Sequence, residues 1–178
     1  MTDSKQIKDF IKPNLLPVII LFFLPPLTII SLVILLFVTI PAYVRAKKSL
    51  AKLEGRGELD KAASEICSPA AKRYVRSKLI LTENYVFCKG NGHVFTYDEI
   101  AWVYKYTYVK RALFIPIKTT ESLYLGTGSM KPNAVATMGK DKMEEIKNAM
   151  LEIRKHNDQC LLGYNDANIA SYKNITAK

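Results

Sequence analysis

The sequence is poor in the residues that build catalytic and metal sites. It contains three cysteines and two histidines, and none of them lies at the spacing of a C-x-x-C pair or of a zinc ligand set. Cys67, Cys88 and Cys160 are far apart and odd in number, which argues against a disulfide framework and favours a reducing compartment. Residues 126–131 are glycine-rich but lack P-loop spacing, so they predict a turn. We therefore expect a protein that is not an enzyme and that has no cofactor or metal.

Charge is also missing from one long stretch. No charged residue occurs between Lys12 and Arg45, and most residues of this interval are large and apolar. Because about 20 helical residues cross a hydrocarbon layer of about 30 Å, residues 13–45 predict a transmembrane helix that follows an N-terminal tail, residues 1–12. Pro25-Pro26 predicts a kink in the middle of this helix, since proline removes a backbone donor.

Two topologies stay open for this segment. In the first, one kinked helix crosses the membrane; in the second, a shallow re-entrant hairpin turns at the two prolines. The ten residues before Pro25 span only about 15 Å as a helix, which is too short for a full double crossing. A cleaved signal peptide is a third interpretation, but the apolar run is about twice the length of a signal-peptide core.

The flanks of the apolar stretch are basic on both sides. Three lysines precede it (Lys5, Lys8 and Lys12), and a juxtamembrane cluster of five basic residues follows it: Arg45, Lys47, Lys48, Lys52 and Arg56. The positive-inside rule then places the C-terminal domain on the cytoplasmic side of the cell membrane. Basic residues within a Debye length of the head groups attract anionic lipid, so membrane lipid is an expected partner.

Residues 46–72 predict a basic helical connector. Residues 46–54 have helix-forming composition, and Gly55 or Gly57 is expected to end this helix. Residues 58–66 predict a second short helix with Leu59, Ala62, Ala63 and Ile66 on one side, and Pro69 ends it.

The remainder of the chain changes from alternating to helical periodicity. Strands are predicted at residues 79–82, 85–88, 94–97, 101–110, 113–117, 122–126 and 134–138, with a hairpin turn at Gly90-Asn91-Gly92. A final amphipathic helix is predicted over residues 141–153, whose apolar stripe contains Met143, Ile146, Ala149, Met150 and Ile153.

One predicted strand is rich in aromatic residues. Its alternation places Trp102, Tyr104, Tyr106 and Tyr108 on one face. This face is either a stacking platform for single-stranded nucleic acid or a buried surface under the helix at 141–153. The membrane anchor favours the buried surface, so no nucleic-acid partner is expected.

Four basic residues near the same strand form a candidate lipid or partner patch: Lys105, Lys110, Arg111 and Lys118. A chain reversal at Lys110-Arg111 is expected to bring Lys118 back near residues 103–105. Such a patch suits anionic lipid or an acidic protein.

The order of these elements resembles the pleckstrin-homology superfold. Residues 79–87, Leu-Ile-Leu-Thr-Glu-Asn-Tyr-Val-Phe, are similar to the first strands of bacterial pleckstrin-homology-like domains, and residues 95–103 resemble a later strand of those domains. The arrangement as a whole is similar to small uncharacterised bacterial membrane-anchored proteins with such a cytoplasmic domain. The resemblance implies a fold and an anchor, and it brings no activity, substrate or binding residues.

The expected fold is therefore α+β: an N-terminal apolar transmembrane helix plus a pleckstrin-homology-like antiparallel β-sandwich or barrel with a C-terminal helix, over residues 73–157. A C-terminal extension, residues 158–178, contains a further short helix. The expected function is that of a membrane-anchored adaptor that holds an unknown protein partner, or another copy of itself. The alternative is an anionic-lipid-binding module at the cytoplasmic membrane face.

Overall fold

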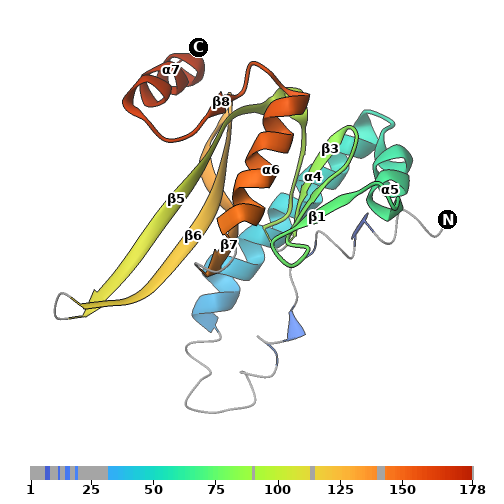
Figure 1. Ribbon diagram of the computed structural model, residues 1–178. Helices are drawn as coiled ribbons and strands as arrows, with labels where there is room; N and C mark the ends of the chain where they lie inside the picture. The colour runs from blue at the N-terminus through green and yellow to red at the C-terminus, as the bar shows by residue number, and fades with distance from the viewer. Residues whose placement is uncertain are drawn as a thin grey trace. The chain divides into compact units, whose positions relative to one another are not determined.

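The computed structural model describes residues 7–8, 12, 15–16, 19, 32–89, 91–112, 115–139 and 143–177. The contacts divide the chain into two compact units. Figure 1 shows the helices and strands of the chain, coloured by residue number. Unit 1 comprises Met1–Ala71 and Phe87–Val94, and unit 2 comprises Lys72–Val86 and Phe95–Lys178. Residues 87–94 thus belong with the N-terminal helices, although they lie among the strands in the sequence.

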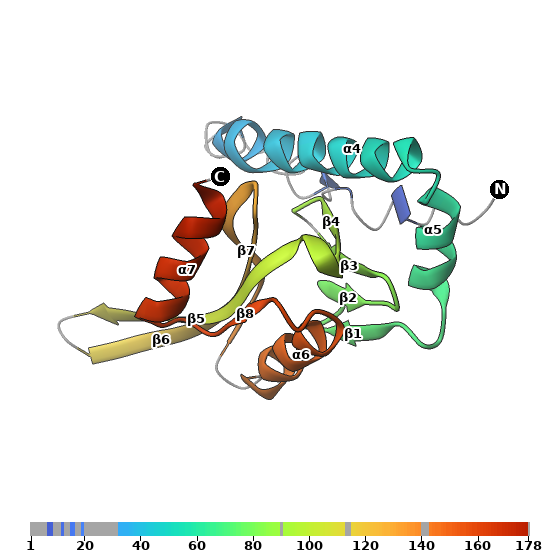
Figure 2. The same ribbon diagram turned by 90° about the horizontal axis from the view of Figure 1, so that it is seen from above.

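Unit 1 is built on two consecutive helices, α4 (Ile40–Gly55) and α5 (Leu59–Cys67), which Figure 2 shows one after the other. A π-helical turn, η2 (Leu35–Thr39), precedes α4, and the Ile40 N–H donates to the Leu35 carbonyl five residues back. Pro41 accounts for this wide turn, because its ring crowds the carbonyl four residues earlier and it has no N–H to donate.

The predicted transmembrane helix over residues 13–45 is wrong for the part of the chain that the structure describes. Among those residues, no helix combines the length and the apolar composition that a membrane crossing needs. The physical reason lies in α4, which carries Arg45, Lys47, Lys48 and Lys52, so that only its first turns are apolar. The described residues leave out most of the predicted segment, including Pro25-Pro26: residues 13–14, 17–18 and 20–31. Most of both predicted topologies therefore lies outside the described residues.

The two predicted helices after residue 45 are confirmed. Helix α4 ends at Gly55, and Gly57 adopts a φ of +69°, the left-handed conformation that commonly follows a helix end. Helix α5 buries Ala62, Ala63 and Ile66 on one side, as its spacing predicts. Both helices therefore present an apolar stripe toward the inside of unit 1.

The first sheet contains four short strands in sequential order: β1 (Lys72–Tyr74), β2 (Leu79–Leu81), β3 (Tyr85–Cys88) and β4 (His93–Thr96). Strand β1 has no counterpart among the predicted strands. It reaches β2 through Val75, Arg76 and Ser77, which all adopt positive φ angles between 55° and 59°. Each such residue other than glycine costs about 1–2 kcal/mol, and the Glu145 carboxylate stabilises this turn by accepting the Val75 N–H at 2.7 Å.

The second sheet has the order β7-β6-β5-β8. Its strands are β5 (Ile100–Ala112), β6 (Ile115–Thr127), β7 (Met130–Gly139) and β8 (Leu161–Leu162). The pairs β5–β6 and β6–β7 are antiparallel, and the pair β5–β8 is parallel. The predicted separate strands at 113–117 and 122–126 are wrong, because β6 is continuous: Thr119, Thr120 and Glu121 pair with β5 and lack the turn residues that would interrupt a strand.

Two helices complete unit 2: α6 (Met143–His156) and α7 (Asp166–Thr176). Helix α6 contacts β5 and β6 and buries three residues of the predicted stripe completely, Ile146, Ala149 and Ile153, whereas Met150 is half-buried. Figure 2 shows α6 and α7 as separate helices beside the β5–β6 hairpin. The chain is thus α+β, with antiparallel sheets and a C-terminal helix.

The aromatic face of β5 is covered by α7, so the prediction that the helix at 141–153 covers it is wrong. Trp102, Tyr104 and Tyr172 form one buried cluster, and Ile169 of α7 packs against it. The Tyr172 hydroxyl donates to the Thr127 carbonyl at 2.7 Å, which fastens α7 to the sheet. We call Trp102, Tyr104, Tyr106 and Tyr108 the aromatic ladder, and only its first two residues are buried.

Candidate functional site

Unit 1 exposes an unusual number of large apolar side chains. They lie on η2, on the residues directly before it and on the first turns of α4: Leu32, Val33, Leu36, Phe37, Val38, Ile40, Tyr43 and Val44. Phe37 is the extreme case, with 75% of its surface exposed. Scattered apolar residues are normal on a protein surface, but a contiguous set of this size marks an interaction surface. We call these eight residues the apolar run.

The opposite side of α4 is fixed by close packing within unit 1. Ala42 and Ala46 are buried, and they approach the turn between β3 and β4 so closely that a Cβ on Gly92 would lie 2.5 Å from the Ala42 carbonyl oxygen and 2.6 Å from the Ala46 nitrogen. The Ser49 hydroxyl donates to the Gly92 carbonyl at 2.8 Å. This packing determines which face of α4 is available for binding.

The juxtamembrane cluster follows the apolar run on the same helix. Lys47, Lys48, Lys52 and Arg56 are exposed, whereas Arg45 is half-buried. The Arg45 charge adds to the main effect of burial in lowering the pKa of His93 to about 4. All five predicted basic residues therefore lie on α4 or at its C-cap, within about 16 Å along the axis, but Arg45 is turned partly inward.

The second predicted patch is only partly assembled in unit 2. Lys110 and Lys118 are direct partners across the β5–β6 hairpin, and Arg111 follows a register shift and pairs with Pro116. The expectation that Lys118 returns near residues 103–105 is wrong, because Lys105 is opposite Leu123.

Lys105 makes an ion pair away from the other three residues of this patch. Its ammonium lies 3.1 Å from the carboxylate of Glu121, a residue that is only 1% exposed. The Thr107 hydroxyl donates to the same carboxylate oxygen at 3.4 Å. A buried carboxylate needs such a partner, so the position of Lys105 is explained by Glu121 rather than by a ligand.

The aromatic ladder changes character along β5. Trp102 donates its indole N–H to the Gly163 carbonyl at 2.8 Å, and burial, followed by neighbouring tyrosines, raises the pKa of Tyr104 to about 12. Tyr106 and Tyr108 lie beyond the buried cluster and are about half exposed. The first two residues are therefore structural, and the last two are available on the surface.

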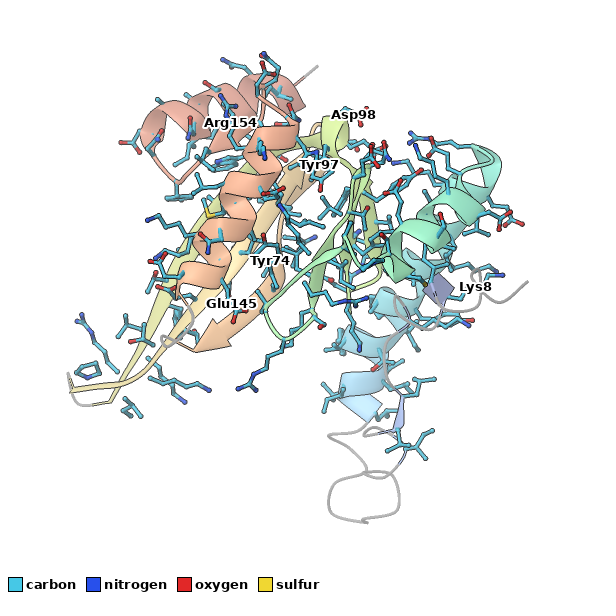
Figure 3. The ribbon with its side chains drawn as sticks, turned by 45° about the vertical axis from the view of Figure 1, so that its right-hand side comes forward. Lys8, Tyr74, Tyr97, Asp98, Glu145 and Arg154 are labelled. Carbon is cyan, nitrogen blue, oxygen red and sulfur yellow. The ribbon has the colours of Figure 1, made fainter. Side chains whose placement is uncertain are left out.

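The histidines and cysteines form no catalytic or metal arrangement in the described part of the chain. No group of three metal-binding side chains occurs there. His156 stacks on Tyr97 with ring centroids 4.2 Å apart, and Asn157 donates to the Tyr97 carbonyl at 2.7 Å; Figure 3 labels Tyr97 beside the end of α6. Burial raises the pKa of the Cys88 and Cys160 thiols, the latter to about 12, so neither is an activated nucleophile.

Two residues near α4 have a position that the sequence pattern does not show. Lys8 and Lys12 flank the apolar stretch in the sequence, and in the structure both line a cavity on α4 together with Tyr43 and Lys47. The i, i+4 spacing of the two lysines, which is typical of side chains that meet on a helix, is the sequence signal that could have paired them.

Comparison of this chain with protein-family models, with curated proteins and with solved structures finds no match. The resemblance to pleckstrin-homology-like membrane proteins therefore stays a prediction. The function must be argued from the surface of the molecule alone.

Proposed function

We propose that this protein is a non-enzymatic module that binds the surface of membranes containing anionic lipid, through the apolar run and the basic residues of α4. The observation that carries the proposal is the order of these residues along the helical stretch from residue 32 through η2 to the C-cap of α4. Eight exposed apolar side chains come first, and four exposed basic side chains follow directly. A helical segment with an apolar end and a basic end can place the apolar end at the acyl boundary of a membrane and the basic end at the anionic head groups.

Apolar insertion and electrostatic attraction are expected to contribute similar free energies to membrane binding. Full burial of a large apolar side chain is worth about 1.5–3 kcal/mol, and the eight residues are roughly half exposed, so inserting several of them gains several kcal/mol. Each lysine or arginine near an anionic surface adds about 1 kcal/mol. Stable attachment usually requires two such signals together, and α4 carries both.

A lipid surface suits this face better than a second copy of the chain. The protein has a formal net charge of +10, and two copies joined at α4 would bring the basic residues of both copies together. Anionic head groups neutralise these charges. We also propose the cytoplasmic face of the membrane as the location, because no disulfide joins the three cysteines.

The test is co-sedimentation of the full-length protein with vesicles of phosphatidylcholine alone or with phosphatidylglycerol added. We expect attachment to the anionic vesicles that weakens as salt rises. Phe37→Asp should reduce this attachment at least tenfold. Ile117→Asp, which changes an apolar residue of unit 2 that is 62% exposed, is the matched control and should bind like the wild type.

Equal attachment of the Phe37→Asp variant would contradict the proposal. The proposal would also be contradicted if the protein bound neither kind of vesicle and instead formed a dimer that the Phe37→Asp substitution dissociates. Such a dimer would assign the apolar run to self-association.

The β5–β6 hairpin supports a second candidate function, that of an adaptor for an acidic protein. Lys110 and Lys118 are directly opposite each other, and like charges at such positions destabilise a hairpin. Tyr106 and Tyr108 are exposed on the same strand. An acidic partner would relieve the repulsion and cover the aromatic rings. A photo-crosslinker at position 108 should capture one acidic protein in native membranes, and the double variant Lys110→Glu/Lys118→Glu should abolish this product.

A further inference from the structure

Unit 1 contains a cavity of about 270 Å³ along one side of α4. Its α4 wall contains Tyr43, Lys47, Leu50 and Glu54, which recur at helical spacing and so share one stripe of the helix. Lys8 and Lys12 from the N-terminal segment complete the lining. Figure 3 shows Lys8 beside the helices of unit 1.

Local structure brings the two N-terminal lysines to the same wall. The Lys12 N–H donates to the Lys8 carbonyl at 3.2 Å, so these two residues lie close to each other. The neighbouring Ile7 is completely buried. Lys8 therefore follows a buried residue and is hydrogen-bonded to Lys12.

The charges of the lining are unbalanced. Lys8, Lys12 and Lys47 contribute three positive charges, and Glu54 contributes one negative charge at the far end, 11 residues or about 16 Å along α4 from Tyr43. A phosphate group offers several acceptor oxygens and one or two negative charges, and lysine binds it as a point charge. The Tyr43 hydroxyl can donate a further hydrogen bond.

The size and position of the cavity narrow the class of ligand. Its volume is slightly below the range of pockets that bind drug-sized molecules, so the cavity fits a ligand no larger than a small phosphate ester. Tyr43 also belongs to the end of the apolar run, so the cavity begins where the membrane-facing part of α4 ends. With the apolar end of this helical segment at the acyl boundary, that position is the depth of the head groups.

We propose that this cavity binds one phosphate ester of the glycerol phosphate type, with the ammonium groups of Lys8, Lys12 and Lys47 around the phosphate. The inference rests on the proposed function in so far as the ester belongs to a phospholipid. A soluble glycerol phosphate has the same chemistry. With this site the protein binds an individual head group in addition to the charged surface of the membrane.

Acylation of each lysine in the full-length protein, followed by mass spectrometry, tests the site. One arm uses vesicles with phosphatidylglycerol, and the other uses millimolar sn-glycerol 3-phosphate without membranes. We expect Lys47 to react at least threefold more slowly with a ligand present, while its neighbour Lys48, which is outside the cavity, changes less. Protection in the vesicle arm alone identifies a lipid ligand, and protection by glycerol 3-phosphate identifies a phosphate site that also accepts soluble esters.

A pair of charge-matched variants separates the cavity from general attraction. Lys8→Gln/Lys47→Gln and Lys48→Gln/Lys52→Gln each remove two positive charges, but only the first pair lines the cavity. We expect the first pair to lose at least tenfold more affinity for the anionic vesicles than the second. Equal losses, together with equal acylation of Lys47 and Lys48 in both arms, would overturn the site. Failure to sediment with vesicles would instead contradict the proposed function, because the glycerol 3-phosphate arm needs no membrane.

Discussion

Replacing Gly92 by alanine should detach the β3–β4 turn from α4. The substitution has two costs. Gly92 adopts a φ of +74°, where an L-residue costs about 1–2 kcal/mol, and the new Cβ would meet backbone atoms of Ala42 and Ala46 at 2.5 and 2.6 Å. Overpacking of this kind costs a further 1–3 kcal/mol or so. We therefore expect a loss of about 2–5 kcal/mol in the stability of unit 1.

Gly57→Ala is the matched control for this prediction. Gly57 has nearly the same φ, +69°, but no atom lies within 4 Å of a Cβ built there. Its substitution should cost only the backbone strain, about 1–2 kcal/mol. The difference between the two variants therefore measures the packing of the turn on α4.

The reactivity of Cys88 with an aromatic disulfide reagent at constant pH provides the assay. Cys67 is exposed and reacts first, whereas Cys88 of unit 1 and Cys160 of unit 2 are buried and react only when their unit opens. Because each loss of about 1.4 kcal/mol in stability raises the opening equilibrium tenfold, Gly92→Ala should increase the reaction rate of Cys88 by about 30-fold or more. The reaction rate of Cys160 should change much less. An acceleration no larger than that of Gly57→Ala would refute the packing.

Three further predictions concern unit 2 and the pH response of unit 1. Tyr172→Phe should destabilise unit 2 by about 1–2 kcal/mol in urea unfolding followed by Trp102 fluorescence, because the Thr127 carbonyl loses its donor; no change would mean that α7 is held otherwise. Ser77→Gly should stabilise the same unit by up to about 1 kcal/mol in the same assay, since φ is 59° there, and a loss would contradict the left-handed turn. Burial, and then the charge of Arg45, lower the pKa of His93 from 6.5 to about 4 in the folded protein. Between pH 6.5 and pH 4 the unfolded chain therefore binds more protons than the folded chain does. Unit 1 should therefore lose about 3 kcal/mol as pH falls from 6.5 to 4, and hydrogen exchange of α4 should show that His93→Gln abolishes most of this loss.

Local patterns predicted most of the individual elements correctly. Glycine at residues 55 and 57 indicated the end of α4, and the apolar spacing of α5 and α6 identified their buried faces. These signals are local, because the residues that define them are close in sequence. Strand β1 was missed because it has only three residues, two of them basic, and depends on its pairing with β2.

Long-range pairing limited the prediction of the sites. The alternation of β5 predicted one aromatic face, but only the fold shows that α7 covers it and that the cover ends before Tyr106. The sequence does not show that Lys105, unlike Lys110, makes an ion pair within the protein. Its partner Glu121 lies on β6, and the register of the hairpin brings the two residues together. The cavity likewise joins residues 8 and 47, which no local pattern connects.

The depth of residue 37 at a membrane tests the central proposal most directly. An environment-sensitive fluorophore is attached to Phe37→Cys in a Cys67→Ser background, where the thiols of Cys88 and Cys160 are buried and react slowly. The same probe at Asn174→Cys, on the exposed surface of α7, is the control. We predict that the probe at position 37 brightens with vesicles of ordinary phosphatidylglycerol and is dimmer with vesicles of brominated phosphatidylglycerol, while the probe at position 174 shows neither change. Identical responses at the two positions would contradict membrane binding through the apolar run.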